Sequence, residues 1–159
     1  MKIGVDTNVL VYAVGFDSED KQSTAIELLT RLDPQTVLVP VFVLAELHYV
    51  ISRKLRDKRL ASKLLRVQAS AFDVIGSTAL SLSKALDLVD QHDLQIFDAI
   101  ILAECTRAGC RILLTEDGQH GFEKDGCTLI DPFKTPMHPL LAEALTSSAA
   151  ARSDQETDP

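Results

Sequence analysis

The sequence lacks any uninterrupted apolar run close to the ~20 residues that a membrane-spanning helix requires. Its N-terminus also lacks the cationic region, the extended apolar core and the small-residue cleavage site of a secretory signal. We therefore expect a protein without a membrane-spanning segment that resides in the cytoplasm.

Cysteine is scarce, and Cys105, Cys110 and Cys127 contain no CxxC pair. This odd, unpaired set argues against a disulfide framework and against a structural zinc site, so buried free thiols are expected. Positive charge is in deficit too, with 16 Lys and Arg against 23 Asp and Glu and a net charge of −7. The molecule as a whole is therefore not a basic nucleic-acid binder, and only local charge could give it that role.

The length and composition fit one globular domain: the 159 residues are 46% hydrophobic and 25% charged, and they contain no internal repeat. We assign residues 1–134 to that domain. Residues 135–159 contain Pro136 and Pro139 and then become rich in Ala, Ser, Asp and Glu. This composition predicts a C-terminal tail that is largely disordered, with a nascent helix around 140–145.

Short β-branched or apolar runs alternate with segments of helical periodicity along the domain. Strands are expected at 3–5, 36–39, 72–75, 111–115 and 128–130, and helices at 7–14, 19–32, 41–52, 78–91 and 94–108. Strands that alternate with helices predict an α/β fold with a parallel sheet.

Four acidic residues interrupt this apolar framework. Asp6 and Asp117 follow two of the expected strands, and ligands in open α/β sheets bind beyond the carboxyl ends of strands. Glu46 lies on or beside the apolar stripe of its helix, and Asp98 lies within the stripe of another helix. Two of them have simpler alternative roles. Asp6 could serve merely as a helix cap, and Glu46 could reach water at the margin of its stripe.

Four carboxylates that converge repel one another and raise one another's pKa values, a penalty that a divalent cation removes. The sequence has no His and Cys cluster, so the donor set favours a hard ion such as Mg²⁺ or Mn²⁺ over zinc. Such ions at carboxylate clusters characteristically support phosphoryl chemistry.

Four blocks of sequence resemble the PIN domain family, in particular the VapC-type toxin ribonucleases of bacterial toxin–antitoxin pairs. The blocks are VDTNVLVYA around Asp6, VLAEL around Glu46, IFDAIILAEC around Asp98 and ILLTEDGQHG around Asp117. The resemblance runs from residue 2 to about residue 132, in the family's order. It implies an α/β/α sandwich of three layers with a mainly parallel central sheet.

By the same resemblance, Asp6, Glu46, Asp98 and Asp117 would hold Mg²⁺ or Mn²⁺ and carry catalysis. Asn8 and Thr115 match auxiliary polar positions that orient a carboxylate or a water molecule. The implied activity is endonucleolytic hydrolysis of RNA, usually by a homodimer. The implied partner is an antitoxin protein whose C-terminal segment lies across the active site. We interpret Glu116 and His120, which flank Asp117, as loop residues.

Seven of the sixteen basic residues fall between residues 52 and 66, where Asp57 is the single acid. This stretch is either an ordinary solvated helix face or a surface that follows a phosphate backbone. Arg53, Arg56 and Arg59 are its candidate RNA-binding residues.

Other functions remain open beside the toxin ribonuclease. A phosphatase of the haloacid dehalogenase type also begins with a strand and an Asp, but it needs a second Asp two residues later, where this chain has Asn8. A PIN-like module could bind RNA or protein without cutting. A housekeeping RNA-processing nuclease would carry the same motifs as a toxin.

Overall fold

The computed structural model describes residues 1–16 and 18–155, with side chains described as far as residue 150. Within this part of the chain the strands are β1 (Ile3–Val5), β2 (Val37–Pro40), β3 (Asp73–Ile75), β4 (Ile112–Leu114), β5 (Glu123–Lys124) and β6 (Cys127–Ile130). The helices are α1 (Thr7–Ala13), α2 (Glu19–Arg31), α3 (Val41–Leu55), α4 (Lys58–Ala69), α5 (Ala79–His92), α6 (Ile96–Arg107) and α7 (Pro139–Gln155), with a 3₁₀ turn at Pro34–Thr36.

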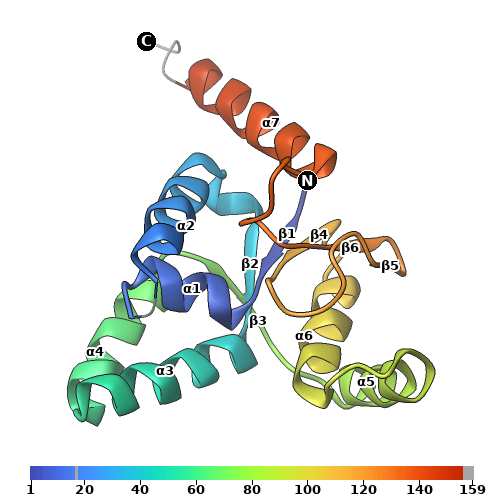
Figure 1. Ribbon diagram of the computed structural model, residues 1–159, viewed down its shortest axis with the longest axis horizontal. Coiled ribbons are helices and arrows are strands. Elements are labelled where there is room, and N and C mark those ends of the chain that lie inside the picture. The colour runs from blue at the N-terminus through green and yellow to red at the C-terminus, as the bar shows by residue number, and fades with distance from the viewer. Residues whose placement is uncertain (17, 156–159) are drawn as a thin grey trace.

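The strands form one sheet in the order β3-β2-β1-β4-β6-β5, which is parallel except for the terminal β5. Figure 1 shows α1 to α4 on one side of this sheet and α5 and α6 on the other. This arrangement follows from the strand order, because right-handed crossovers that proceed in opposite directions place their helices on opposite faces. The predicted α/β sandwich with a mainly parallel sheet is confirmed.

The direction of the strand order reverses between β1 and β4. From β1 the chain proceeds to β2 and β3 on one side, and β4 then pairs with the other edge of β1. The backbone N–H of Asp6 donates to the carbonyl of Leu114 at 3.0 Å, which ties the carboxyl ends of the two strands together. A crevice at such a reversal is where open α/β sheets bind their ligands.

The core lies on both faces of the sheet and includes all three thiols. Cys105, Cys110 and Cys127 are buried and free, as predicted. Cys105 packs against β1 so closely that a Cβ on Gly4 would lie 2.4 Å from its sulfur. Glycine at position 4 therefore lets α6 approach the strand that leads into Asp6.

The C-terminal segment differs from the predicted disordered tail. Residues 139–155 form α7, and Leu141, Ala144 and Leu145 are buried. The hydroxyl of Ser148, on the same face, accepts the backbone N–H of Asp33 at 3.1 Å. The spacing 141, 144, 145, 148 is that of a helix face, and alanine is the strongest helix former, so the composition that suggested a tail supports a packed helix. Residues 156–159 lie outside the described part of the chain.

No helix in the described part of the chain combines the length and the apolar character needed to cross a membrane.

Glu104 on α6 is completely buried, and neither of its carboxylate oxygens has a hydrogen-bond partner among the described residues. Burial raises the pKa of Glu104, and the nearby Ser77 side chain and then the positive charge of Arg107 oppose this rise. A buried polar group without a partner lowers the stability of the fold. It is hydrated in the unfolded chain, loses that water on folding and receives no hydrogen bond in exchange.

We therefore expect Glu104→Met to stabilise the protein by about 1–2 kcal/mol, since the substitution keeps an unbranched side chain and removes the unpaired carboxyl group. Urea denaturation of both proteins at pH 7 measures this difference. A destabilised Glu104→Met variant would show that the carboxyl group has a stabilising role.

Candidate metal centre

Asp6 connects the end of β1 to the start of α1. As the N-cap residue it accepts the backbone N–H of Thr7 at 2.6 Å, and it also accepts the Thr115 hydroxyl at 2.6 Å and the Asn8 amide at 3.0 Å. Only 5% of Asp6 is exposed. Burial raises its pKa from the ordinary 3.8 to about 6; the hydrogen bonds oppose the rise, and the charges of Asp98 and Asp117 add to it.

Glu46 and Asp98 approach the same place from two helices. Glu46 lies in the second turn of α3, where its carboxylate accepts the hydroxyl of Thr7 at 2.6 Å. Asp98 lies in the first turn of α6. Burial raises the pKa of Asp98, and the charges of Asp117 and Glu46 raise it further. Both carboxylates are half-buried, as their positions at the apolar stripes predicted.

Asn8 and Thr115 hold Asp117 to this cluster. The Asn8 amide donates to the Asp117 carboxylate at 3.1 Å and to the Thr115 hydroxyl oxygen at 3.2 Å, in addition to its bond with Asp6. The backbone N–H of Asp117 donates to the Thr115 hydroxyl oxygen at 3.0 Å. The two predicted auxiliary residues thus lie between the acids that follow β1 and β4, and Asp117 itself is exposed.

All four predicted acids line one open cavity of about 280 Å³. Asp6, Asp98 and Asp117 also line a smaller, more apolar pocket beside it, of about 20 Å³. The fold therefore brings acids that are up to 111 residues apart in the sequence, from 6 to 117, into one site at the reversal of strand order.

The donor chemistry of this cavity fits a divalent cation, because four carboxylates supply hard oxygen atoms and an excess of negative charge. Burial is the main cause of the raised pKa values of Asp6 and Asp98, and repulsion from the neighbouring acids, which a cation would relieve, adds to it. In the described part of the chain, no three His, Cys, Asp or Glu side chains are arranged as a ready metal-binding group. The carboxylates are instead held by hydrogen bonds to Thr7, Asn8 and Thr115.

A second network borders the cavity, and the sequence did not indicate it. The Glu116 carboxylate accepts hydrogen bonds from the Tyr12 hydroxyl and from the Lys21 ammonium, and Lys21 also donates to Tyr12 at 3.2 Å. The Glu116 hydrogen bond raises the pKa of Lys21, and burial followed by the Glu116 hydrogen bond raises that of Tyr12. Glu116 lies in the loop after β4, as interpreted from the sequence, and its side chain is in addition hydrogen-bonded to residues of α1 and α2.

The three candidate RNA-binding arginines lie at the corner between α3 and α4 and do not line the cavity. Arg53 is in the last turn of α3, Arg56 caps that helix with a φ of 55°, and Arg59 is in the first turn of α4. All three are exposed.

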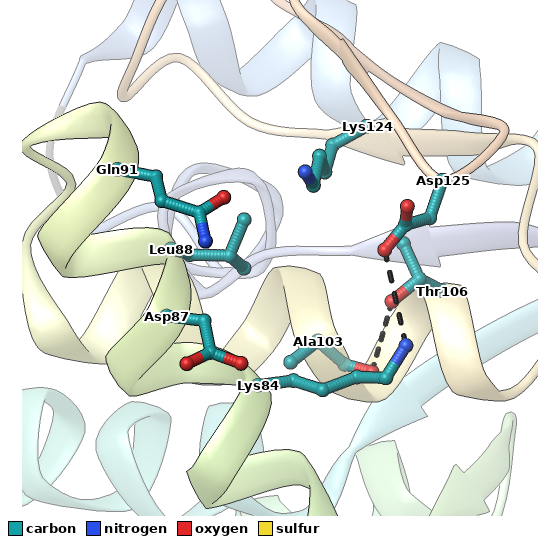
Figure 2. Close-up of a pocket in the computed structure, with 8 residues that line it drawn as sticks. All are labelled: Lys84, Asp87, Leu88, Gln91, Ala103, Thr106, Lys124 and Asp125. Carbon is teal, nitrogen blue, oxygen red and sulfur yellow. Dashed lines mark hydrogen bonds and ion pairs between the residues drawn. The ribbon is translucent and has the colours of Figure 1, made fainter.

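Another cavity, of about 150 Å³, lies between α5, the C-terminal half of α6 and the turn between β5 and β6 (Figure 2). Its charges balance: Lys84 and Lys124 face Asp87 and Asp125, and Lys84 lies 3.9 Å from Asp125. It opens near the amino end of β6, so it is separate from the acidic cavity at the carboxyl ends of the strands.

Fold and site together define an α/β protein with an acidic, oxygen-donor cavity at the reversal of its sheet. Residues 3–124 match the family model of the PIN domain, and the chain belongs to the PIN domain family. PIN domains are typically metal-dependent nucleases. No curated protein sequence matched the chain.

Several solved structures share the fold. VapC20 of Mycobacterium tuberculosis, a toxin that cleaves the sarcin–ricin loop, has a TM-score of 0.62 and 22% identity over 74% of this chain and 92% of that one. A toxin–antitoxin complex from Klebsiella pneumoniae has a TM-score of 0.63 and 20% identity over 84% and 99%. VapBC2 from Rickettsia felis, crystallised with a fragment of its promoter DNA, has a TM-score of 0.59 and 23% identity over 81% and 97%. The structural neighbours are thus VapC toxins of toxin–antitoxin systems, and at these identities the likeness concerns the fold.

Proposed function

We propose that this protein is a metal-dependent endoribonuclease that hydrolyses RNA phosphodiester bonds and acts as the toxin of a toxin–antitoxin pair. The observation that carries the proposal is the single cavity lined by Asp6, Glu46, Asp98 and Asp117. Four unrelated segments of a PIN domain supply these acids, and a module that only bound RNA would gain nothing from their mutual repulsion.

In this proposal the four acids would hold Mg²⁺ or Mn²⁺. When bound, the cation supplies Lewis-acid activation of water and neutralises charge on the phosphate. Asp6 must give up its proton to act as a ligand, and its bonds from Thr7, Asn8 and Thr115 fix the direction of its carboxylate. Glu46 or Asp117 takes the proton of the attacking water. Asn8 keeps Asp117 beside Asp6 while this occurs.

The proposed partners are an RNA substrate, an antitoxin protein and a second copy of the chain in a homodimer. The Klebsiella pneumoniae neighbour was crystallised as a toxin–antitoxin complex. Residues 1–134 would form the nuclease domain, with α7 as a helix packed onto it.

Cleavage of a panel of structured and single-stranded RNAs tests the activity. We expect internal cuts with Mg²⁺ or Mn²⁺ and none with EDTA. A folded protein that binds RNA tightly in EDTA and never cuts it in either metal would instead be the non-catalytic module. A neighbouring gene for a small DNA-binding protein would distinguish a toxin from an RNA-processing enzyme.

The basic corner between α3 and α4 should contribute to RNA affinity by neutralising phosphates. Replacing Arg53, Arg56 and Arg59 together by Gln is expected to weaken RNA binding. It should also lower the slope of log K against log salt by about 0.7 for each phosphate that is no longer neutralised. Fluorescence anisotropy between 50 and 200 mM salt measures both quantities. An unchanged affinity and slope would make this corner an ordinary solvated surface.

A further inference from the structure

The protein has few aromatic residues, six Phe and two Tyr with no Trp, and it exposes few of those. In the described part of the chain, Tyr49 and Phe97 are the only exposed aromatic residues, at 58% and 54%. Exposing a ring to water is unfavourable, and two exposed rings near one site offer a contact surface to a ligand. Each belongs to a helix that contributes an acid to the acidic cavity: Tyr49 lies three residues after Glu46, and Phe97 directly before Asp98.

Tyr49 belongs to a straight row along α3. Residues 42, 46, 49 and 53 are separated by four, three and four positions, which places their side chains on one face of a helix. The row therefore reads Phe42, Glu46, Tyr49, Arg53, with a cavity acid between two rings. At 1.5 Å per residue, Phe42 and Tyr49 are about 10 Å apart along the helix axis.

Phe97, on α6, contacts the row at its N-terminal end, where Phe42 lies. Its ring stacks on Phe42, with centroids 5.3 Å apart and planes inclined by 25°. Phe97 directly precedes Asp98, so the exposed ring and a cavity acid come from the same turn of α6. The stack on Phe42 holds the Phe97 ring in place before any ligand arrives, which lowers the entropic cost of binding.

Arg53 lies at the C-terminal end of the row, where it contacts Tyr49. Its guanidinium carbon lies 5.6 Å from the centre of the Tyr49 ring, and its Nη1 donates to the Tyr49 hydroxyl at 3.2 Å. A ring paired with a cation offers a stacking face and a positive charge at one point. An unpaired nucleotide presents the complementary pair of groups, a base and a phosphate.

We propose that Phe97 and Tyr49 are base-stacking residues that receive unpaired bases of a single-stranded RNA on the two sides of the acidic cavity. This inference rests on the proposed ribonuclease function and names its substrate class. A base on each ring would draw the intervening backbone across Glu46 and Asp98. Duplex RNA would bind poorly at these rings, because stacked and paired bases have no free faces to offer.

The test uses the full chain and a labelled 12-nucleotide RNA of mixed, unpaired sequence. Anisotropy in EDTA at low salt gives affinity, and cleavage of the same RNA in Mg²⁺ is measured in parallel. Tyr49→Leu and Phe97→Leu remove a ring and keep an apolar side chain, and each should weaken binding by at least about fivefold. Tyr49→Phe keeps the ring and should remain within about twofold. Leu86→Ala, at an exposed position on α5, is the matched control and should bind like the wild type.

Base stacking has a direct readout as well. With 2-aminopurine in the RNA, its fluorescence should fall on binding to the wild type and to Leu86→Ala, and it should fall less with either Leu variant. The duplex form of the same RNA should bind all variants alike.

The outcomes separate this inference from the proposed function. Ring-dependent binding of the 12-nucleotide RNA, with no cleavage of any RNA of the panel in Mg²⁺ or Mn²⁺, would support base stacking and refute the ribonuclease. Cleavage with ring-independent affinity and unchanged 2-aminopurine fluorescence would refute base stacking and leave the ribonuclease standing. Failure of the wild type to bind single-stranded RNA would overturn the inference. The same holds if the Leu variants alter only the oligomeric state, since the rings would then contact protein.

Discussion

Asp98→Asn is expected to reduce metal-dependent RNA cleavage by at least about a hundredfold and to leave the fold intact. Removal of groups that merely orient a metal ligand already costs 10- to 100-fold in typical sites, and Asp98 would be a ligand itself. Its carboxylate lies in the first turn of α6, where it faces the charges of Asp117 and Glu46. Asparagine keeps the shape of the side chain and removes the negative charge, so packing in α6 should not change.

The matched control is Asp87→Asn, which removes the same charge from the balanced cavity on α5 shown in Figure 2. Asp87→Asn should cleave RNA like the wild type. Circular dichroism and thermal denaturation of both variants establish that each is folded. Cleavage by folded Asp98→Asn at the wild-type rate would remove Asp98 from the site.

The acids of the cavity were predictable because each carries a local signal. Asp6 and Asp117 follow short apolar strands, and parallel strands bring their carboxyl ends to one edge of the sheet. Asp98 interrupts an apolar stripe, which is costly without a specific environment. Asn8 and Thr115 came from the family resemblance, and the structure places them as hydrogen-bond partners of Asp6.

The network around Glu116 had no such signal. Glu116 meets Tyr12 and Lys21 across separations of 104 and 95 residues, and polar residues in turns and helices are ordinary at each of these positions. Only the packing of α1 and α2 beside the loop after β4 brings them together. The row of rings on α3 was similarly hidden, because its meaning depends on which aromatic residues stay exposed.

The C-terminal helix shows a different limit. Composition alone gave residues 135–159 the character of a tail, since alanine, serine and acidic residues are common in disordered segments. What decides the outcome is the spacing of Leu141, Leu145 and Ser148, which face the rest of the domain from α7. An amphipathic face predicts a helix only if a partner surface exists, and that surface is a tertiary feature.

The second large effect concerns Asp6 and pH in the metal-free protein. Because the pKa of Asp6 is about 6 in the folded protein and 3.8 ordinarily, folding favours the protonated carboxyl group. The stability that Asp6 contributes is fully present below pH 3.8 and is lost as the pH rises through about 6. The loss is about 3 kcal/mol at pH 7.5. Asp6→Asn mimics the neutral form, so in EDTA it should exceed the wild type in stability by up to that amount at pH 7.5 and by little at pH 4.

Urea denaturation in EDTA at pH 4, 5, 6 and 7.5 measures the difference between wild type and Asp6→Asn, and Asp87→Asn controls for the removal of one acid. Taking the difference cancels the pH dependence of the other carboxylates, which both proteins share. A constant difference from pH 4 to 7.5 would mean that folding does not raise the pKa of Asp6.

Added Mg²⁺ should invert this ranking. A cation must displace the proton on Asp6, so its apparent affinity should fall about tenfold for each pH unit below about 6. Above pH 7 the wild type should gain stability from Mg²⁺ by mass action, and Asp6→Asn should gain little. The carboxylate that destabilises the empty protein is then the one that binds the ion. If Mg²⁺ stabilised both proteins equally at pH 7.5, the ion would be binding elsewhere, and the raised pKa of Asp6 would be only a consequence of its burial.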